Sequence, residues 1–571
     1  MMKVMKKLIL VALGTALALT ASAQSWQDAL LYSTYEYGGT ARSVAMGNAF
    51  TAVGGDLGSI GINPAGSAVA GYSQFTITPG VTISTANATS ADPDLAYGDN
   101  VRTVFSRMKM PNLGFVVSMD TGHRSGVKRM SLGFVSNSTS DFTSRMYAGG
   151  VNATNSYCGS LASQAAGYPE DALAGTSSIY GWWNLDDYNA TYGLPWEDMV
   201  AYRSAIFGTV NGRYLGLTDW DKDGKSSGVL APLYQKYGFQ TKGYKHDMLV
   251  NFGLNFNDTF YLGANLGIST LRYGQSEYWY EEPNNEAEFP AVPFDVNPNA
   301  RFRYLDMKRI FDAKGSGVYL KVGALWRLGA LRLGAAVQTP TVMRMETRMA
   351  WYGKAVVDGV NLPSSKSPEW EDSYALVSPW RFNAGLAFTL GQSVLLSADY
   401  EIANYRSCYF RTRSESGLYY GNEYFSDVNA DIKDVLGASH MLRIGAEAKI
   451  SQAFAVRLGY GFTTSPERNY LEWVYNPSDG TDHLMVFPLT AQERAAMCRH
   501  YLSAGLGFTT GPFFADIAVR YKMRYNQYYI PYTYYDYTGT NYTSKYTVDA
   551  VPEVTTTYGR IEALLTVGWR F

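Results

Sequence analysis

The sequence predicts an all-β fold: a transmembrane antiparallel β-barrel of about fourteen strands with a small N-terminal luminal plug and long external loops. The clearest observation is at the C-terminus, where residues 560–571 alternate between an apolar and a polar face. Hydrocarbon cannot satisfy exposed backbone groups, so a strand with a wholly apolar outer face implies a closed barrel. Similar segments recur along the chain, and short and long connections alternate between them. The apolar face carries Ile561, Ala563, Leu565, Val567, Trp569 and Phe571.

The first 23 residues have the pattern of an export signal. A lysine-containing start precedes an apolar run at 8–19, and small residues at 21–23 form a cleavage site. We therefore expect the mature chain to begin at Gln24. Export together with a barrel predicts the outer membrane of a Gram-negative bacterium.

The composition excludes several classes of protein. No later run of about 18 apolar residues is present, which excludes a helical membrane protein, whereas a mean hydropathy of −0.17 is compatible with alternating strands. The 45 Tyr and 56 Gly suit aromatic girdles and tightly packed strands. A net charge of −2 with no basic patch argues against nucleic acid as a partner. Cys158, Cys408 and Cys498 are too few for a disulfide framework, although one pair could form.

Segments with a period of two residues mark the strands. At about 3.3 Å per residue and a tilt near 45°, about ten residues cross an apolar band of ~25 Å, so their lengths fit a membrane. The expected strands lie near 72–84, 110–119, 129–138, 247–256, 259–270, 317–328, 331–340, 380–390, 393–404, 440–450, 453–463, 499–509, 513–524 and 559–571.

The connections alternate strictly between tight and long, which is typical of short periplasmic turns and long external loops. The second long segment exceeds a hundred residues, and structureless loops of that size are rare, so we expect it to be structured and to cap the barrel mouth. The expected external loops lie near 85–109, 139–246, 271–316, 341–379, 405–439, 464–498 and 525–558.

The segment 24–71 does not have the pattern of a strand. It is rich in glycine and small residues, with weak helical periodicity at 27–35 and 41–52. A barrel of about fourteen strands has a lumen too wide to be filled by its own side chains. We therefore expect a signal peptide at 1–23, a plug or hatch at 24–71, and the barrel at 72–571.

The plug segment contains a specific pattern. A glycine-rich stretch at 38–52 is followed by Gly-Asp-Leu at 55–57 and by Asn-Pro-Ala-Gly at 63–66. This resembles the N-terminal plug signature of the FadL-type outer membrane transporter family, which carries long-chain fatty acids, toluene and related hydrophobic compounds, in a Bacteroidetes-like form. The resemblance is close over 37–75 and otherwise architectural.

The resemblance implies a fourteen-stranded barrel, an external hydrophobic capture site, a deeper pocket near the plug, and exit sideways into the membrane through a gap in the wall. The segment 139–246 is longer than the family pattern and leaves the substrate open. Fatty acid, aromatic hydrocarbon, haem and steroid are all compatible with the sequence.

Asn63 and Pro64 have a local mechanism, because Asn caps a turn and Pro fixes φ, so together they can hold a bend at the plug's exit. An ordinary turn before a strand is the alternative. The charged plug residues could pair with luminal charges such as Glu447 or Arg457. The residues assigned to the plug and its gating are Asn63, Pro64, Ala65, Gly47, Arg42 and Asp56.

Asp219, Asp221 and Asp223 have the spacing of the first half of a calcium loop. Leu230 stands where an EF-hand needs glutamate, so a full EF-hand is excluded. Calcium in an external loop and a solvated acidic turn remain as alternatives, and no other cofactor is indicated. The overlapping G-x-S-x-G match at 224–228 lacks the strand and helix of a nucleophile elbow, so we do not expect an enzyme.

Aromatic residues in the expected loops are candidates for external ligand contacts. They are Trp182, Trp183 and Trp220 in the second loop and Tyr532 and Tyr534 in the last. Packing of loops against one another is the alternative role.

Two functions follow. The first is a channel for passive uptake of hydrophobic small molecules, driven by burial at roughly 25 cal/mol per Å² and gated by the plug. The alternative is a surface adhesin or structural barrel whose loops bind glycans or proteins. The expected partners are a hydrophobic ligand, outer membrane lipid, and the barrel-assembly machinery through Phe571.

Overall fold

The computed structural model describes twelve stretches of the chain. They are residues 24–90, 96–174, 194–210, 212–219, 229–292, 297–391, 393–412, 424–476, 481–533, 535–537, 546–548 and 552–571. The expected signal peptide and Trp182, Trp183, Trp220, Asp221, Asp223 and Tyr534 lie outside these residues.

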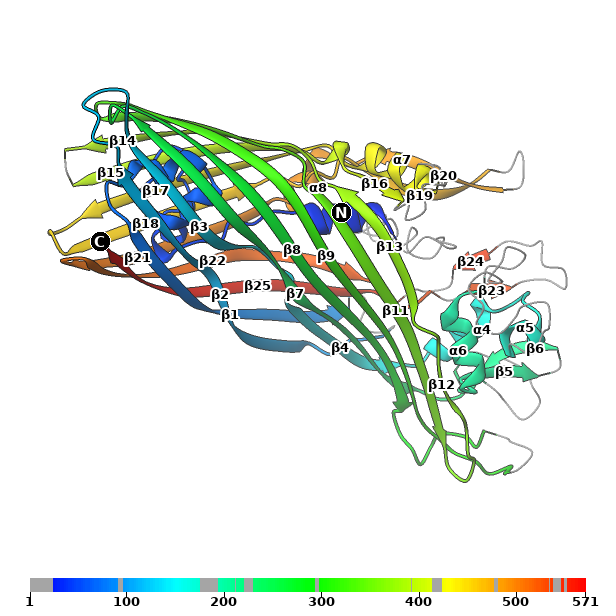
Figure 1. Ribbon diagram of the computed structural model, residues 1–571. Helices are drawn as coiled ribbons and strands as arrows, with labels where there is room; N and C mark the ends of the chain where they lie inside the picture. Colours follow the sequence, from blue (N-terminus) through cyan, green and yellow to red (C-terminus); the bar gives the residue numbers. More distant parts are fainter. Residues whose placement is uncertain are drawn as a thin grey trace.

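Fourteen antiparallel strands close into one barrel, which confirms the predicted fold (Figure 1). Each strand pairs with both neighbours in chain order, and the ring closes where Gln74 of the first strand pairs with Arg570 of the last. The strands are β1 (Gln74–Ser90), β2 (Val101–Asp120), β3 (Val127–Asp141), β7 (Leu233–Phe256), β8 (Phe260–Pro283), β9 (Phe302–Leu328), β10 (Leu331–Gln338), β14 (Arg381–Leu390), β15 (Val394–Asn404), β17 (Ala438–Lys449), β18 (Phe454–Thr463), β21 (Arg499–Thr510), β22 (Phe513–Tyr529) and β25 (Val554–Arg570).

Tight turns join the strands at one end of the barrel. Asn257 and Asp258, between β7 and β8, have φ of 55° and 58°. Positive φ at both central residues is typical of a two-residue hairpin turn whose twist matches that of the flanking strands. Gly329 and Gly511 also take positive φ, of 61° and 57°. The C-terminus lies at this same end (Figure 1).

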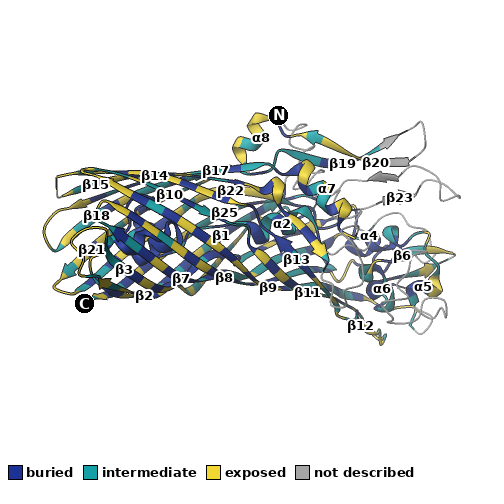
Figure 2. Cartoon of the chain, turned by 45° about the horizontal axis from the view of Figure 1, so that its top comes forward, coloured by how far each residue is buried: buried dark blue, intermediate teal, exposed yellow. Residues whose placement is uncertain are grey.

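Along each strand, exposed and buried residues alternate (Figure 2). In β17, Leu442 and Ile444 are exposed on the outer face, whereas Arg443 and Glu447 are buried within the barrel. The outer face is therefore apolar, and the charges point into the lumen. Among the described residues, no helix is long and apolar enough to cross a membrane.

The wall is much taller on one side than on the other. β7 and β8 have 24 residues each and β9 has 27, whereas β14 and β18 have 10 each. At about 3.3 Å per residue and a 45° tilt, the long strands extend ~30 Å beyond a ~25 Å band. Five further strands widen this raised side: β4 (Ser144–Asn152), β11 (Val342–Val357), β12 (Ser364–Lys366), β13 (Trp370–Val377) and β16 (Tyr409–Thr412).

Much of the chain expected as external loop is therefore strand. The sequence predicts loops at 85–109, 139–246, 271–316 and 341–379, yet large parts of these segments are strands of the barrel and its raised wall. The cause is physical: above the apolar band the outward residues are polar or aromatic, so the apolar alternation that marks a membrane strand is missing.

A cap covers the outer end of the raised wall (Figure 1). Its helices pack with the hairpin β5–β6 around a hydrophobic core that includes Tyr157, Leu161, Phe207 and Trp279. The remaining outer elements are α4 (Tyr157–Gln164), α5 (Glu170–Ala174), α6 (Trp196–Arg203), β5 (Phe207–Val210), β6 (Arg213–Gly216), η3 (Tyr405–Ser407), α7 (Ser426–Val435), β19 (Asn469–Asn476), β20 (Thr481–Pro488), α8 (Ala491–Ala496), β23 (Tyr535–Tyr537) and β24 (Tyr546–Val548).

The N-terminal segment lies inside the barrel (dark blue in Figure 1). Each of its helices begins at a polar cap: Ser25, Thr40, Asp56 and Asn63 accept a hydrogen bond from the following turn. The helices are short, so contacts with the wall must hold them in place. They are α2 (Trp26–Ser33), α3 (Ala41–Ala45), η1 (Leu57–Gly61) and η2 (Pro64–Val69).

Candidate functional site

The plug rests on a patch of glycines in the wall, which we call the glycine seat: Gly263, Gly323, Gly334 and Gly385 of β8, β9, β10 and β14. Gly263 pairs with Gly323, and Gly334 pairs with Gly385. A Cβ on Gly263 would lie 2.3 Å from the carbonyl carbon of Pro64, and one on Gly334 would lie 2.1 Å from a backbone oxygen of the plug. The plug backbone thus touches the wall backbone, and only glycine permits this approach.

Asn63 joins the plug to the seat. Its side-chain Nδ2 donates to the carbonyl oxygens of Thr51 (2.7 Å) and of Ala324 in β9 (3.0 Å). Its Oδ1 accepts from the backbone N–H of Ala65 (3.1 Å), and Pro64 occupies the first turn of η2. The side chain is fully buried. Asn63 therefore caps a helix and holds the plug to the wall.

Gly47 makes a second close contact, with β17, β18 and β21. It has φ of +62°, which favours glycine, and a Cβ there would lie 2.9 Å from the carbonyl oxygen of Ile444. Its carbonyl accepts from the Tyr501 hydroxyl (2.9 Å), and its N–H donates to Ser503 Oγ (3.2 Å). No larger residue fits this position without strain.

Arg42 links the plug to the wall by charge. Its guanidinium donates two hydrogen bonds to Glu447, at 2.8 and 2.9 Å. Glu447 also accepts from Arg457 (2.6 Å), which donates in turn to Asp516. Asp56, by contrast, bonds within the plug, where it caps η1. The gating roles of these residues stay predictions.

Wall side chains hold the end of α2 and the residues that follow it by polar contacts. Lys245 donates to the carbonyl of Tyr32 (2.9 Å), and Arg381 donates to that of Ser33 (2.6 Å). The Tyr35 hydroxyl donates to Asp247 (2.8 Å). This part of the N-terminal segment is therefore held by charged groups and also by backbone contacts with β3, where the Glu36 N–H donates to the carbonyl of Thr139 (2.7 Å) and the Gly38 N–H donates to that of Ser138 (2.9 Å).

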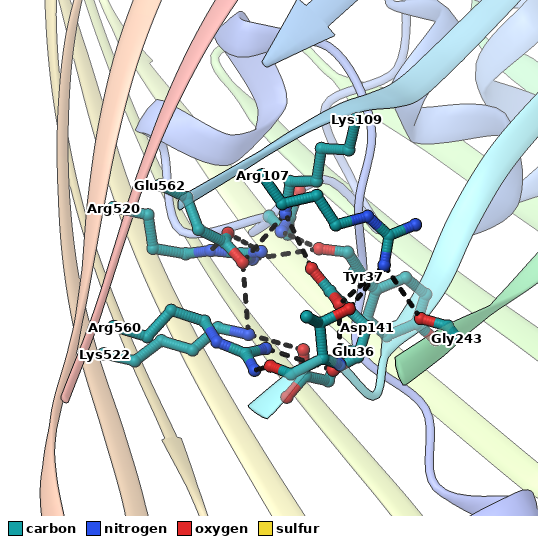
Figure 3. A network of polar contacts seen from close by, with 12 residues as sticks. Glu36, Tyr37, Arg107, Lys109, Asp141, Gly243, Arg520, Lys522, Arg560 and Glu562 are labelled. Carbon is teal, nitrogen blue, oxygen red and sulfur yellow. Dashed lines mark hydrogen bonds and ion pairs between the residues drawn. The ribbon is translucent and has the colours of Figure 1, made fainter. Parts of the chain in front are cut away.

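Below it lies a group of charges on β2, β3, β22, β25 and the N-terminal segment (Figure 3). Lys109 donates to Glu562 (2.9 Å), as does Arg520 (2.7 Å). Lys522 donates to Glu36 of the N-terminal segment. We call the basic members the cationic cluster; they outnumber the carboxylates by five to three. The cations are Arg107, Lys109, Arg520, Lys522 and Arg560, and the carboxylates are Glu36, Asp141 and Glu562.

The wall beside this cluster has a break in its backbone pairing. The β1–β2 register shifts between Thr78 and Gly80, where Pro79 cannot donate to a neighbour. On the other edge of β1, pairing with β25 passes from Ile77 directly to Gly80. Pro111 of β2 lines a small cavity there with Lys109, Glu562 and Glu36. As it stands the cavity holds about 10 Å³, roughly one water.

The upper lumen is apolar. Around α2, the wall and the outer elements bury aromatic, methionine and aliphatic side chains, although a barrel lumen is usually polar. Phe142 belongs to this lining, and its neighbour Asp141 belongs to the charged group, so the two regions adjoin. The lining includes Leu271, Tyr273, Met343, Met345, Tyr374, Leu376 and Phe410.

Two candidate residues in the cap are buried. Asp219 accepts from Ser156 Oγ (2.8 Å), and burial raises its pKa to about 7. No group of three or more metal-ligating side chains occurs within the part of the chain that the structure describes. The Tyr532 hydroxyl accepts a hydrogen bond from Gln235 Nε2 (2.7 Å) and is buried in the cap core. Calcium binding through the acidic run and ligand contact by Tyr532 stay predictions.

Sequence reasoning did not find the glycine seat or the cationic cluster. The seat's glycines come from four strands, and only the fold brings them together. The sequence does contain a pattern that indicates the cluster. Arg520 and Lys522 are two residues apart at inward positions of β22, and Arg560 and Glu562 are two residues apart at inward positions of β25. Charges repeated at every second position of two neighbouring strands indicate a charged lumen.

The chain matches no protein-family model and no curated protein sequence. Among solved structures it is similar to a Pseudomonas aeruginosa FadL homologue (TM-score 0.48, 11% identity, covering 94% of this chain and 99% of that one). It is also similar to the P. putida toluene transporter TodX (0.47, 11%, 94% and 99%) and the Ralstonia pickettii toluene transporter TbuX (0.44, 11%, 94% and 99%). A likeness at this level says nothing about substrate, and the barrel assignment rests on the strand pairing above.

Proposed function

We propose that this barrel is an outer membrane channel for passive uptake of hydrophobic small molecules with an anionic end, such as long-chain fatty acids, and that the N-terminal plug gates it. The observation that carries the proposal is the adjacency of an apolar upper lumen and a cationic cluster. An amphiphile fits this order of surfaces with its tail above and its charged group below.

The driving force is burial of the tail, at roughly 25 cal/mol per Å² of apolar area, so no energy source is required. A carboxylate would bind Lys and Arg of the cluster by charge-assisted hydrogen bonds. In the structure Glu36 supplies such a carboxylate to Lys522. An incoming anion therefore competes with Glu36 and, on binding, frees the N-terminal segment from this contact.

The glycine seat and the break at Pro79 lie on different sides of the ring, on β8–β14 and on β1–β2 respectively. At the glycine seat the plug backbone is in direct contact with the wall backbone, so it cannot shift there without breaking this packing. We place the exit at the break, where Pro79 interrupts the backbone pairing of β1 and the cationic cluster adjoins, so the solute leaves sideways into the membrane.

The belt of exposed apolar side chains on the outer face supports membrane insertion, and the export signal supports the outer membrane. Phe571 follows the last strand, and 71% of its surface is exposed. We propose that the barrel-assembly machinery recognises it.

The test is titration of the detergent-purified barrel with a fluorescent long-chain fatty acid. We expect saturable binding, at least about tenfold weaker for a long-chain alcohol, which lacks the charge. Glu36→Gln should tighten fatty acid binding, because it removes the competing carboxylate. Glu288→Gln, at an exposed site in the outer region, is the matched control and should change nothing. Absence of saturable binding for every long-chain amphiphile would contradict the proposal.

The adhesin alternative rests on the cap, which has its own hydrophobic core. It predicts that removing the cap abolishes binding of glycans or proteins at the cell surface while uptake of solute continues. The channel proposal predicts that uptake changes as well, since the cap covers the barrel mouth.

A further inference from the structure

On the outer face of the raised wall, the type of exposed side chain changes with distance from the membrane. On β7, β8 and β9 an apolar zone is followed by a row of cations, and stacked tyrosines of β8 and β9 stand above that row. Figure 1 shows these three strands running together far beyond the short ones. We infer that this face binds a phosphorylated glycolipid of the outer leaflet, and the inference rests on the membrane placement proposed above, not on transport.

Three exposed cations form the row, which we call the cation triad: Lys242, Arg272 and Lys314. Arg272 and Lys314 are direct cross-strand partners. Like charges in this arrangement repel each other. Two carboxylates share this face: Asp312 and the Lys242 side chain both lie over Gly274, and Glu346 is the cross-strand partner of Lys314. Glu346 is held by Arg344 (3.1 Å), which leaves Asp312 beside three cations, so an external anion between Arg272 and Lys314 would relieve their repulsion.

The triad lies at the height where lipid phosphates are expected. The pair Ile268 and Val318, both exposed and apolar, is four residues below Arg272 and Lys314 along the same two strands. At about 3.3 Å per residue and a 45° tilt, the cations are ~9 Å above this pair. The inward neighbours at this level, such as Lys245, contact the N-terminal segment, so the triad faces away from the lumen.

Above the triad, flat aromatic rings stand on the same face. The Tyr278 and Tyr280 rings are stacked with centroids 6.1 Å apart, and Tyr280 stacks on Tyr304 at 5.6 Å. The Lys236 ammonium lies 4.6 Å from the Tyr280 ring centre. Stacked, half-exposed tyrosines offer apolar faces and polar hydroxyls, which is the surface that sugar rings pack against.

From the membrane upward the order is apolar, cationic, aromatic. A glycolipid with phosphates on its first sugars has the same order: acyl chains, phosphates, sugars. The short strands on the other side, such as β17 and β18 with 12 and 10 residues, do not reach this height. The site therefore belongs to the raised side of the barrel only.

The test is a native mass spectrometry titration of the detergent-purified full chain with bisphosphorylated lipid A. The triple variant Lys242→Gln/Arg272→Gln/Lys314→Gln should bind about tenfold more weakly. The control Arg406→Gln/Arg411→Gln/Lys433→Gln removes three exposed cations elsewhere and should bind like the wild type. Heat-modifiable migration on gels confirms that each variant is folded.

A second pair of measurements separates phosphate from sugar. Lipid A stripped of phosphate should bind the wild type as weakly as the triad variant binds the intact lipid. Tyr280→Ala should weaken binding of a core-bearing glycolipid and leave lipid A binding unchanged. Equal binding by wild type and triad variant, or by lipids with and without phosphate, overturns the inference. Fatty acid binding by the triad variant should be intact, so failure here is distinguishable from failure of the channel proposal.

Discussion

Replacing Asn63 by alanine should loosen the plug without disturbing the barrel. The side chain makes three buried hydrogen bonds, to Thr51, Ala324 and Ala65. Each backbone group left without a partner costs about 1–3 kcal/mol, and the terms are not additive, so we expect a loss of about 3 kcal/mol. Each step of about 1.4 kcal/mol changes an equilibrium constant about tenfold, so the population with an unseated plug should rise by roughly a hundredfold.

The assay is ion conductance of single barrels in planar bilayers, with vancomycin sensitivity of cells as a second readout. Asn152→Ala is the matched control, because Asn152 is equally buried and donates to Gln235 (3.1 Å) in the cap, far from the plug. Gly323→Ala should act like Asn63→Ala, since its Cβ would lie 2.0 Å from Asn63 Oδ1. Wild-type conductance in both plug variants, or an equal leak in the control, would refute the role of the seat.

Two further predictions concern buried charges. Arg443 lies fully buried 3.6 Å from both Asp399 and Glu401, so Arg443→Met should lower the free energy of unfolding by about 3 kcal/mol in urea titrations of the barrel in lipid vesicles; a loss below about 1 kcal/mol would contradict this. In the cap, burial raises the pKa of Glu197 and of Asp219 to about 7. The folded cap therefore holds protons that the unfolded chain releases from about pH 4 upward, so its stability falls between about pH 4 and 7, and protease resistance should be lower at pH 8 than at pH 5.

The fourteen membrane strands were predictable because contact with lipid imposes an alternation of apolar and polar residues on each of them. A residue that faces hydrocarbon must be apolar while its neighbours face a polar lumen, so β17 alternates Leu442 and Ile444 with Arg443 and Glu447. A shift by one residue would place charges in lipid, at about 2–4 kcal/mol for each basic side chain near the midplane. The same constraint vanishes above the membrane. The outward residues Arg272, Tyr278 and Tyr280 of β8 lie outside the hydrocarbon there, and the strand continues without an apolar face.

The N-terminal helical segment was predictable as an element, because its glycines, its caps and the Asn63-Pro64 pair are local signals. Its contacts with the wall were not predictable. Gly263, Gly334 and Gly385 are ordinary strand glycines in sequence, and only the barrel's closure sets them against one backbone segment. Long-range packing of this kind has no local pattern, whereas a cap or a turn is decided within a few residues.

The two kinds of contact that hold the N-terminal segment differ in how they can be undone. At the glycine seat, backbone touches backbone, so any displacement opens a void and leaves buried polar groups unpaired. At the cationic cluster the Glu36 side chain meets Lys522, and another carboxylate can take its place at Lys522 at little net cost while the Glu36 backbone N–H stays bonded to Thr139 of β3. An anionic solute therefore acts on the second contact far more readily than on the first. Gating should begin at Glu36 and leave Asn63 in place, so a disulfide or crosslink that fixes the plug at its seat should still permit fatty acid binding, whereas one that fixes Glu36 to β22 should abolish it.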